Sequence, residues 1–228
     1  MGELYVETGL NELRMSNYRR ILSLDSAMVV VQFDKDGVQY QRKYFISYPD
    51  SVMVMKFTAN QSGKQNLILS YCPNSEAKSN LRADGKDGLV YTGVLDNNGM
   101  KFAFRIKAIH KGGTLEAEND RLIVKGADEV VFLLTADTDY KMNFNPDFKD
   151  PKTYVGNDPE QTTRIMMDQA VQKGYDELYR NHEADHTALF NRVRLQLNPD
   201  ISSPNLPTYQ RLANYKKGTP DYQLEQLY

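Results

Sequence analysis

The chain has 228 residues, of which 40% are apolar and 25% charged, and its formal net charge is −2. This composition is typical of a globular protein and excludes extensive disorder. There is no basic block that could follow a nucleic-acid backbone, and the most apolar run, residues 27–31, is too short to span a bilayer. The single cysteine, Cys72, allows no intrachain disulfide. We therefore expect neither nucleic acid nor membrane as a partner.

Residues 18–135 alternate in the manner of β-strands. In one segment apolar side chains fall on one side and charged side chains on the other: Phe102, Phe104 and Ile106 against Lys101, Arg105 and Lys107. A period of two residues predicts a strand with one buried face and one wet face. We therefore expect the three basic residues of this segment to face solvent.

Other runs are apolar on both faces, namely residues 27–31, 52–55 and 130–134, which is typical of strands that lie between two layers. Turn signals separate the runs, as in Asp36-Gly37, where positive φ values suit a hairpin. No alternation of strands with helices appears. Many short strands with frequent turns therefore predict an antiparallel β-sandwich over residues 1–158, in a mainly β fold.

The pattern changes after residue 140. Residues 140–157 are polar and predict a loop, and Asp158 and Pro159 are suited to begin a helix. Apolar residues then recur at spacings of three and four, which predicts one or two helices over residues 159–192, packed on the sandwich. Residues 193–198 alternate like a returning strand. We expect residues 199–228 to form a linker and a first helix, in a chain cut short before its next domain.

One motif suggests chemistry. His182-Glu183-Ala184-Asp185-His186 matches the H-E-x-x-H pattern. On a helix the two histidines would face the same way and could share a zinc ion, while Glu183 would act as general base on a bound water. The pattern raises the hypothesis of a zinc hydrolase.

Three features weigh against a zinc site. A charged residue, Asp185, takes a position that is apolar in buried metalloprotease helices. Leu189 and Arg192 stand where the extended motif needs glycine and histidine, and the downstream glutamate Glu225 lies close to the end of the chain. We interpret His182, Glu183 and His186 as an accidental match, and expect no metal and no cofactor.

Several segments, read in order, resemble glycoside hydrolase family 95, whose members include α-L-fucosidases. They are GELY at 2–5, YRRILSLDSA at 18–27, YFISYPD at 44–50, GADEV at 126–130, GYDEL at 174–178, LFNRV at 189–193 and LPT at 206–208. The resemblance covers almost the whole chain and keeps its order. It implies the N-terminal β-sandwich region of such an enzyme, truncated before the catalytic domain, with His182 in a structural helix.

What the resemblance implies about chemistry lies outside this chain. Family members hydrolyse with inversion in a helical (α/α)6 barrel, where a glutamic acid protonates the leaving group and a base activates water. Those residues would follow Tyr228, so we assign no catalytic residue here. The expected partners are the catalytic barrel of the parent enzyme, an oligosaccharide, and a second copy through open sheet edges. The family suggests a periplasmic or extracellular location. An independent carbohydrate-binding module is the alternative function.

Overall fold

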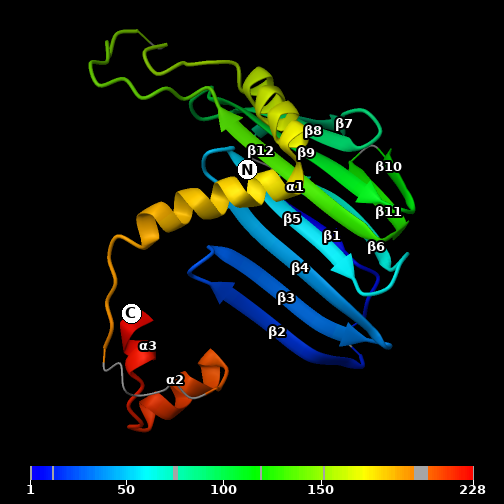
Figure 1. The fold of residues 1–228 in the computed structure, drawn as a ribbon. Helices are drawn as coiled ribbons and strands as arrows, with labels where there is room; N and C mark the ends of the chain where they lie inside the picture. Colours follow the sequence, from blue (N-terminus) through cyan, green and yellow to red (C-terminus); the bar gives the residue numbers. More distant parts are fainter. Residues whose placement is uncertain are drawn as a thin grey trace. The chain divides into compact units, whose positions relative to one another are not determined.

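The computed structural model describes residues 2–11, 13–73, 77–118, 120–150, 152–197 and 205–227. The chain divides into two compact units, Met1–Thr187 and Ala188–Tyr228. The described part of the larger unit contains two antiparallel β-sheets and most of a long helix (Figure 1). The predicted fold class, a mainly β antiparallel sandwich followed by helices, is confirmed.

The larger sheet runs in the order β2-β3-β4-β5-β12-β9-β8-β7. Its strands are β2 (Met15–Ser23), β3 (Met28–Lys35), β4 (Val38–Ser47), β5 (Val52–Ala59), β7 (Ala77–Ala83), β8 (Gly88–Leu95), β9 (Lys101–Lys111) and β12 (Glu129–Thr138). The smaller sheet runs in the order β1-β6-β11-β10, formed by β1 (Gly2–Glu7), β6 (Gln65–Pro73), β10 (Thr114–Glu118) and β11 (Arg121–Ala127). Antiparallel pairing of neighbouring strands explains the many short turns of the sequence.

The main core lies between the two sheets. The larger sheet contributes Phe57, Phe104, Ile106 and Phe132, and the smaller contributes Leu67, Leu69, Leu122 and Val124. Each such side chain stabilises the fold by about 1.5–3 kcal/mol relative to an exposed one. Because alternate residues of a strand point to opposite faces, this core uses one face of each sheet and leaves the other for a further layer.

The buried face predicted for β9 is confirmed, since Phe102, Phe104 and Ile106 all lie in the core. The opposite face of β9 was predicted to be exposed to solvent. This prediction is wrong for Arg105, which is 2% exposed. The reason is tertiary: β12 lies beside β9, and its Thr135 hydroxyl donates to the carbonyl oxygen of Thr163 in the long helix, 3.1 Å away. The helix therefore covers a face that the alternation alone assigns to solvent.

The hairpin predicted at Asp36-Gly37 joins β3 to β4, with φ values of 50° and 77° at the two residues. A two-residue turn of this kind follows the right-handed twist of the flanking strands, which is why Asp-Gly marks it in the sequence. The same short connection sets the register in which Lys35 faces Val38.

The long helix α1 (Pro159–Phe190) covers the outer face of the larger sheet. Its start is capped as predicted, because Oδ1 of Asp158 accepts a hydrogen bond from the Glu160 amide at 3.1 Å. Buried residues of α1 recur at helical spacing and meet side chains of β4, β5 and β12: Met167, Ala170 and Leu178 pack with Phe45, Val54 and Leu133. At Gly174 the helix kinks, with φ 72° and ψ 172°.

Residues 139–150 and 152–158, expected within the sandwich domain or its loop, follow β12, and within these described residues an isolated bridge joins Tyr140 to Val155. None of the helices in the described ranges is long and apolar enough to cross a membrane.

In the smaller unit the predicted strand at 193–198 is not formed over residues 193–197, and residue 198 lies outside the described residues. A strand needs a neighbouring ladder, and here the Leu197 amide instead donates to the side chain of Gln226. The helix expected within 199–228 is divided into α2 (Thr208–Lys216) and α3 (Tyr222–Leu227). Gly218, with φ 93°, and Pro220 separate them. Residues 199–204 of the expected linker lie outside the described residues.

Candidate functional site

The two histidines of the H-E-x-x-H match face the turn between β2 and β3. Nε2 of His182 lies 3.0 Å from the carbonyl oxygen of Ser26, and Nε2 of His186 lies 2.6 Å from that of Leu24. A carbonyl oxygen can only accept, so each of these nitrogens carries a hydrogen and donates. A nitrogen that donates has no lone pair for a metal, so neither Nε2 atom is available as a zinc ligand in this arrangement.

The other contacts of the motif are also those of a packed helix. The ring of His182 stacks on Phe45 with 4.9 Å between centroids. Oε1 of Glu183 accepts a hydrogen bond from the Tyr179 hydroxyl at 2.8 Å. Within the described residues, no three metal-binding side chains gather at one place. These contacts favour a structural role for His182, and the interpretation of the motif as accidental stays a prediction.

Asp50, in the turn between β4 and β5, holds α1 on both sides of its kink. Its carboxylate contacts Nζ of Lys173 at 2.6 Å, just before Gly174, and Nδ2 of Asn181 at 3.2 Å, two turns after it. The Ser47 hydroxyl donates to the second oxygen at 2.6 Å. Burial alone would raise the pKa of Asp50, but these hydrogen bonds outweigh it and lower the pKa. The carboxylate is therefore an anchor for the helix.

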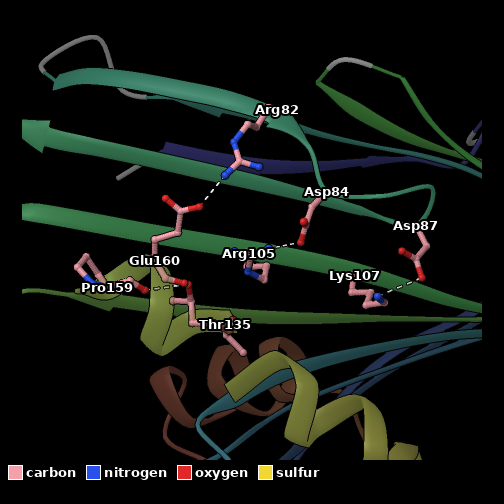
Figure 2. A network of polar contacts seen from close by, with 9 residues as sticks. Arg82, Asp84, Asp87, Arg105, Lys107, Thr135, Pro159 and Glu160 are labelled. Carbon is pink, nitrogen blue, oxygen red and sulfur yellow. Dashed lines mark hydrogen bonds and ion pairs between the residues drawn. The ribbon is translucent and has the colours of Figure 1, made fainter. Parts of the chain in front are cut away.

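A second polar cluster surrounds the first turn of α1 (Figure 2). Nη2 of Arg82 contacts Oε1 of Glu160 at 2.6 Å, which ties β7 to the helix. Arg105 of β9 pairs with Asp84, the residue after β7. Lys107, next on the same face of β9, pairs with Asp87 at 3.3 Å.

A cleft of about 510 Å³ opens beside this cluster. It lies over one end of β7, β8 and β9, and the first turn of α1 forms part of its wall. The lining combines polar residues, Lys78, Ser79, Asn80, Thr92, Lys101, Asp158 and Glu160, with Gly93, Val94, Phe102 and Pro159. Its volume is in the range of small-molecule sites.

Arg105 is the residue of this region that sequence reasoning misplaced. Two of its guanidinium nitrogens, Nε and Nη2, are buried and have no hydrogen-bond partner within the described residues. In the sequence Arg105 stands between Phe104 and Ile106, and such alternation of polar and apolar residues predicts that the polar side chain faces solvent. Its burial depends on β8, β12 and α1, which come from distant parts of the chain.

Two family models match the chain. The model described as "Glycosyl hydrolase family 65, N-terminal domain" matches residues 1–143. The model described as "Glycosyl hydrolase family 95 catalytic domain" matches residues 174–228. The second match begins at Gly174, the kink of α1, so that helix runs from the unmatched segment into the second matched region.

Two curated relatives are similar to almost the whole chain. "Probable alpha-fucosidase A" of Aspergillus niger (strain ATCC MYA-4892 / CBS 513.88 / FGSC A1513) is 27% identical over 91% of this chain and 27% of its own length. "Alpha-L-fucosidase 2" of Arabidopsis thaliana is 26% identical over 95% of this chain and 28% of its own length. The chain thus spans little more than a quarter of each relative.

One solved structure, described as "Putative kojibiose phosphorylase from human microbiome", matches with a TM-score of 0.56 and 10% sequence identity. The match covers 82% of this chain and 27% of that one. At this identity the likeness concerns the fold alone.

Proposed function

Since the chain belongs to the family of glycosyl hydrolase family 65 N-terminal domains, we propose that it is the non-catalytic N-terminal domain of an α-L-fucosidase-like glycoside hydrolase. Its sandwich would support a catalytic helical domain that performs an inverting hydrolysis of α-fucosides or related sugars. The order of the two family matches along one chain, with α1 bridging them, carries this proposal.

The way α1 is held supports a scaffold role. A domain that positions a catalytic body needs a rigid connection, and α1 is fixed by the Asp50 anchor, by the carbonyl contacts of His182 and His186, and by its buried apolar stripe. Motion of the helix against the sheet would break all three sets of contacts together.

The pKa values of three carboxyl groups are consistent with this role. A glycosidase general acid needs a raised pKa so that it is protonated at the start of the reaction. Asp50, Glu129 and Asp221 each have a pKa lowered by basic partners. Such carboxylates serve as ion-pair partners, and in this proposal the acid and the base belong to the catalytic domain.

The proposal is tested by incubating the purified chain with 4-nitrophenyl α-L-fucoside and measuring release of nitrophenol. We expect no release above that of buffer, whereas a full-length α-L-fucosidase assayed in parallel releases it. Turnover that copurifies with the chain through successive columns would contradict the proposal.

One observation favours the second candidate, an independent carbohydrate-binding module. The loop 139–157 presents several aromatic rings to solvent: Phe144 is 94% exposed, Phe148 is 86% exposed, and Tyr140 stacks with Tyr154 at 5.9 Å. Exposed flat rings are the usual platform for the apolar faces of sugars.

Calorimetric titration of the whole chain with a fucosylated oligosaccharide tests this candidate. Binding that is lost in Phe148→Ala and kept in Phe190→Ala, a half-exposed aromatic outside the loop, would support it. Absence of heat at millimolar sugar would contradict it.

A further inference from the structure

A small pocket lies between β4 and β5 of the larger sheet and the start of β6 in the smaller one. Arg42 of β4, Phe57 of β5, and Gln65 and Leu67 of β6 line it, and Thr8, the residue after β1, borders it as well. Its volume is about 10 Å³, close to the space that one water molecule needs. A chloride ion is only moderately larger, so the pocket suits one small ligand.

Arg42 gives this pocket a positive charge. It lies opposite Phe57 in the ladder of β4 and β5, and its Cζ lies 5.0 Å from the ring centroid of Phe33 and 5.8 Å from that of Phe57. Among the described residues Arg42 has no ion pair, and its hydrogen bond goes to the neutral hydroxyl of Tyr44. Aromatic rings attract a cation less strongly than a carboxylate does. The charge of Arg42 therefore has no anionic partner within the described chain.

Two further residues of the lining offer hydrogen-bond donors. Gln65 is 3% exposed, and its Nε2 has no hydrogen-bond partner within the described residues. The last torsion of a glutamine side chain is broad, so this amide can turn toward the pocket. Lys64, the residue before it, is exposed and has no ion pair in the described ranges. Arg42, Lys64 and Gln65 therefore supply two positive charges and an unpaired amide.

Negative charge is missing from the lining. In the part of the chain that the structure describes, no aspartate or glutamate borders the pocket. Asp36, whose charge acts on Tyr40, stands outside the lining and pairs with Lys35 at 3.9 Å. Oδ1 of Asn66, another lining residue, already accepts a hydrogen bond from the Gly126 amide at 2.9 Å. Because an anion only accepts hydrogen bonds, whereas water must also donate, this lining suits an anion.

We propose that this pocket is a halide site, which binds one chloride ion through Arg42, Lys64 and the side-chain amide of Gln65. The volume of the pocket favours a monatomic anion over sulfate or a carboxylate. The ion connects β4 of the larger sheet to β6 of the smaller one, and since it binds only the folded chain it stabilises the sandwich. The site does not depend on the proposed scaffold function, because it lies inside the larger unit and involves neither α1 nor a catalytic domain.

The test uses the whole chain in mixtures of sodium chloride and sodium gluconate at constant ionic strength. We expect the chain to broaden the NMR signal of chloride, and bromide to reverse the broadening by competing for the site. The melting temperature should rise saturably as chloride replaces gluconate. Arg42→Gln is expected to weaken chloride binding at least about tenfold, because it removes a charged donor. Lys64→Gln, at an exposed position, is expected to weaken it about two- to fivefold.

Lys43→Gln is the matched control, since it removes a positive charge from the next residue of β4, which points to the opposite face and does not line the pocket. Its chloride affinity should equal that of the wild type. A chain that responds to chloride no more than to gluconate, as expected of a pocket that holds only water, would overturn the proposal. An equal loss in Lys43→Gln, or full affinity in a folded Arg42→Gln, would also overturn it. Because Lys64 is exposed, its variant keeps the test decisive if Arg42→Gln fails to fold.

Discussion

Nε2 of His182 donates to the carbonyl oxygen of Ser26 at 3.0 Å, joining residues 156 positions apart in the chain. The contact satisfies a carbonyl in the turn before β3 and fixes the second half of α1 over that turn. The most suggestive motif of the sequence thereby takes part in holding the helix to the sheet.

Replacing His182 by alanine should destabilise the larger unit by about 1–3 kcal/mol, because the variant leaves a turn carbonyl without its donor and removes the ring that stacks on Phe45. Urea denaturation of the wild type and variant measures the change. Glu183→Gln is the control, with an expected effect within about 0.5 kcal/mol. One zinc ion per purified chain, lost in both His182→Ala and His186→Ala, would contradict the structural role.

Replacing Gly174 by alanine should cost about 1–3 kcal/mol of stability. Its φ of 72° and ψ of 172° fall in a region that only glycine occupies readily, and, apart from the adjacent residues and the nearby backbone of the helix itself, no described atom lies within 4 Å of the position that a Cβ would take. The cost is therefore one of backbone conformation, without a steric clash. Thermal denaturation compared with Gln172→Ala, an exposed helical neighbour that should be nearly neutral, measures it. A Gly174→Ala variant as stable as this control would show that α1 can straighten freely.

The lowered pKa of Asp50 implies that the stability of the folded chain depends on pH. Its pKa in the folded chain is lowered below the ordinary value of 3.8, so its contribution is present above about pH 4 and is lost as the pH falls through the folded value. Asp50→Asn should therefore destabilise the chain by about 1–3 kcal/mol at pH 7, with a smaller difference from wild type in more acidic solution. Urea denaturation at a series of pH values measures this. A difference that stays constant down to pH 2 would contradict the ionised anchor.

In the smaller unit, Arg211 donates two hydrogen bonds to the carboxylate of Asp221, from Nε to Oδ2 at 2.7 Å and from Nη2 to Oδ1 at 2.5 Å. The hydrogen bond from Arg211 lowers the pKa of Asp221 to about 2, and burial opposes this only in part. The pair should thus persist in acid until the pH falls through about 2, well below the ordinary 3.8. Arg211→Lys should raise this pKa toward its ordinary value, since lysine lacks the planar fork. Titration of the Asp221 carboxyl carbon by NMR measures both values, and equal values in the two chains would refute the forked contact.

Much of the fold could be predicted from local patterns. Alternation found the buried face of β9, Asp36-Gly37 marked a hairpin, and Asp158 marked the start of α1, because each signal acts over a few residues. The same local character of the signals explains why the strand expected at 193–198 is not formed over residues 193–197. An alternating segment becomes a strand only beside a partner, and the Leu197 amide bonds to a side chain instead.

The candidate site was less accessible to prediction. The H-E-x-x-H spacing correctly placed His182 and His186 on one helical face, yet the spacing carries no information on what that face meets. In the structure it meets the carbonyls of the turn before β3. The sequence predicted that Arg105 faces solvent, because no neighbouring residue indicates that α1 covers this face of the sheet.

The sequence by itself determined many of the elements of the larger unit, since hydrophobic period, turn chemistry and helix caps are properties of adjacent residues. It also contained, as an ordered series of short segments, the likeness to glycoside hydrolases that the family matches support. Only the tertiary structure decided the environment of each polar side chain. The burial of Arg105 and the partners of His182 arise where strands and a helix from distant positions pack together, and packing fixes which donors water can still reach.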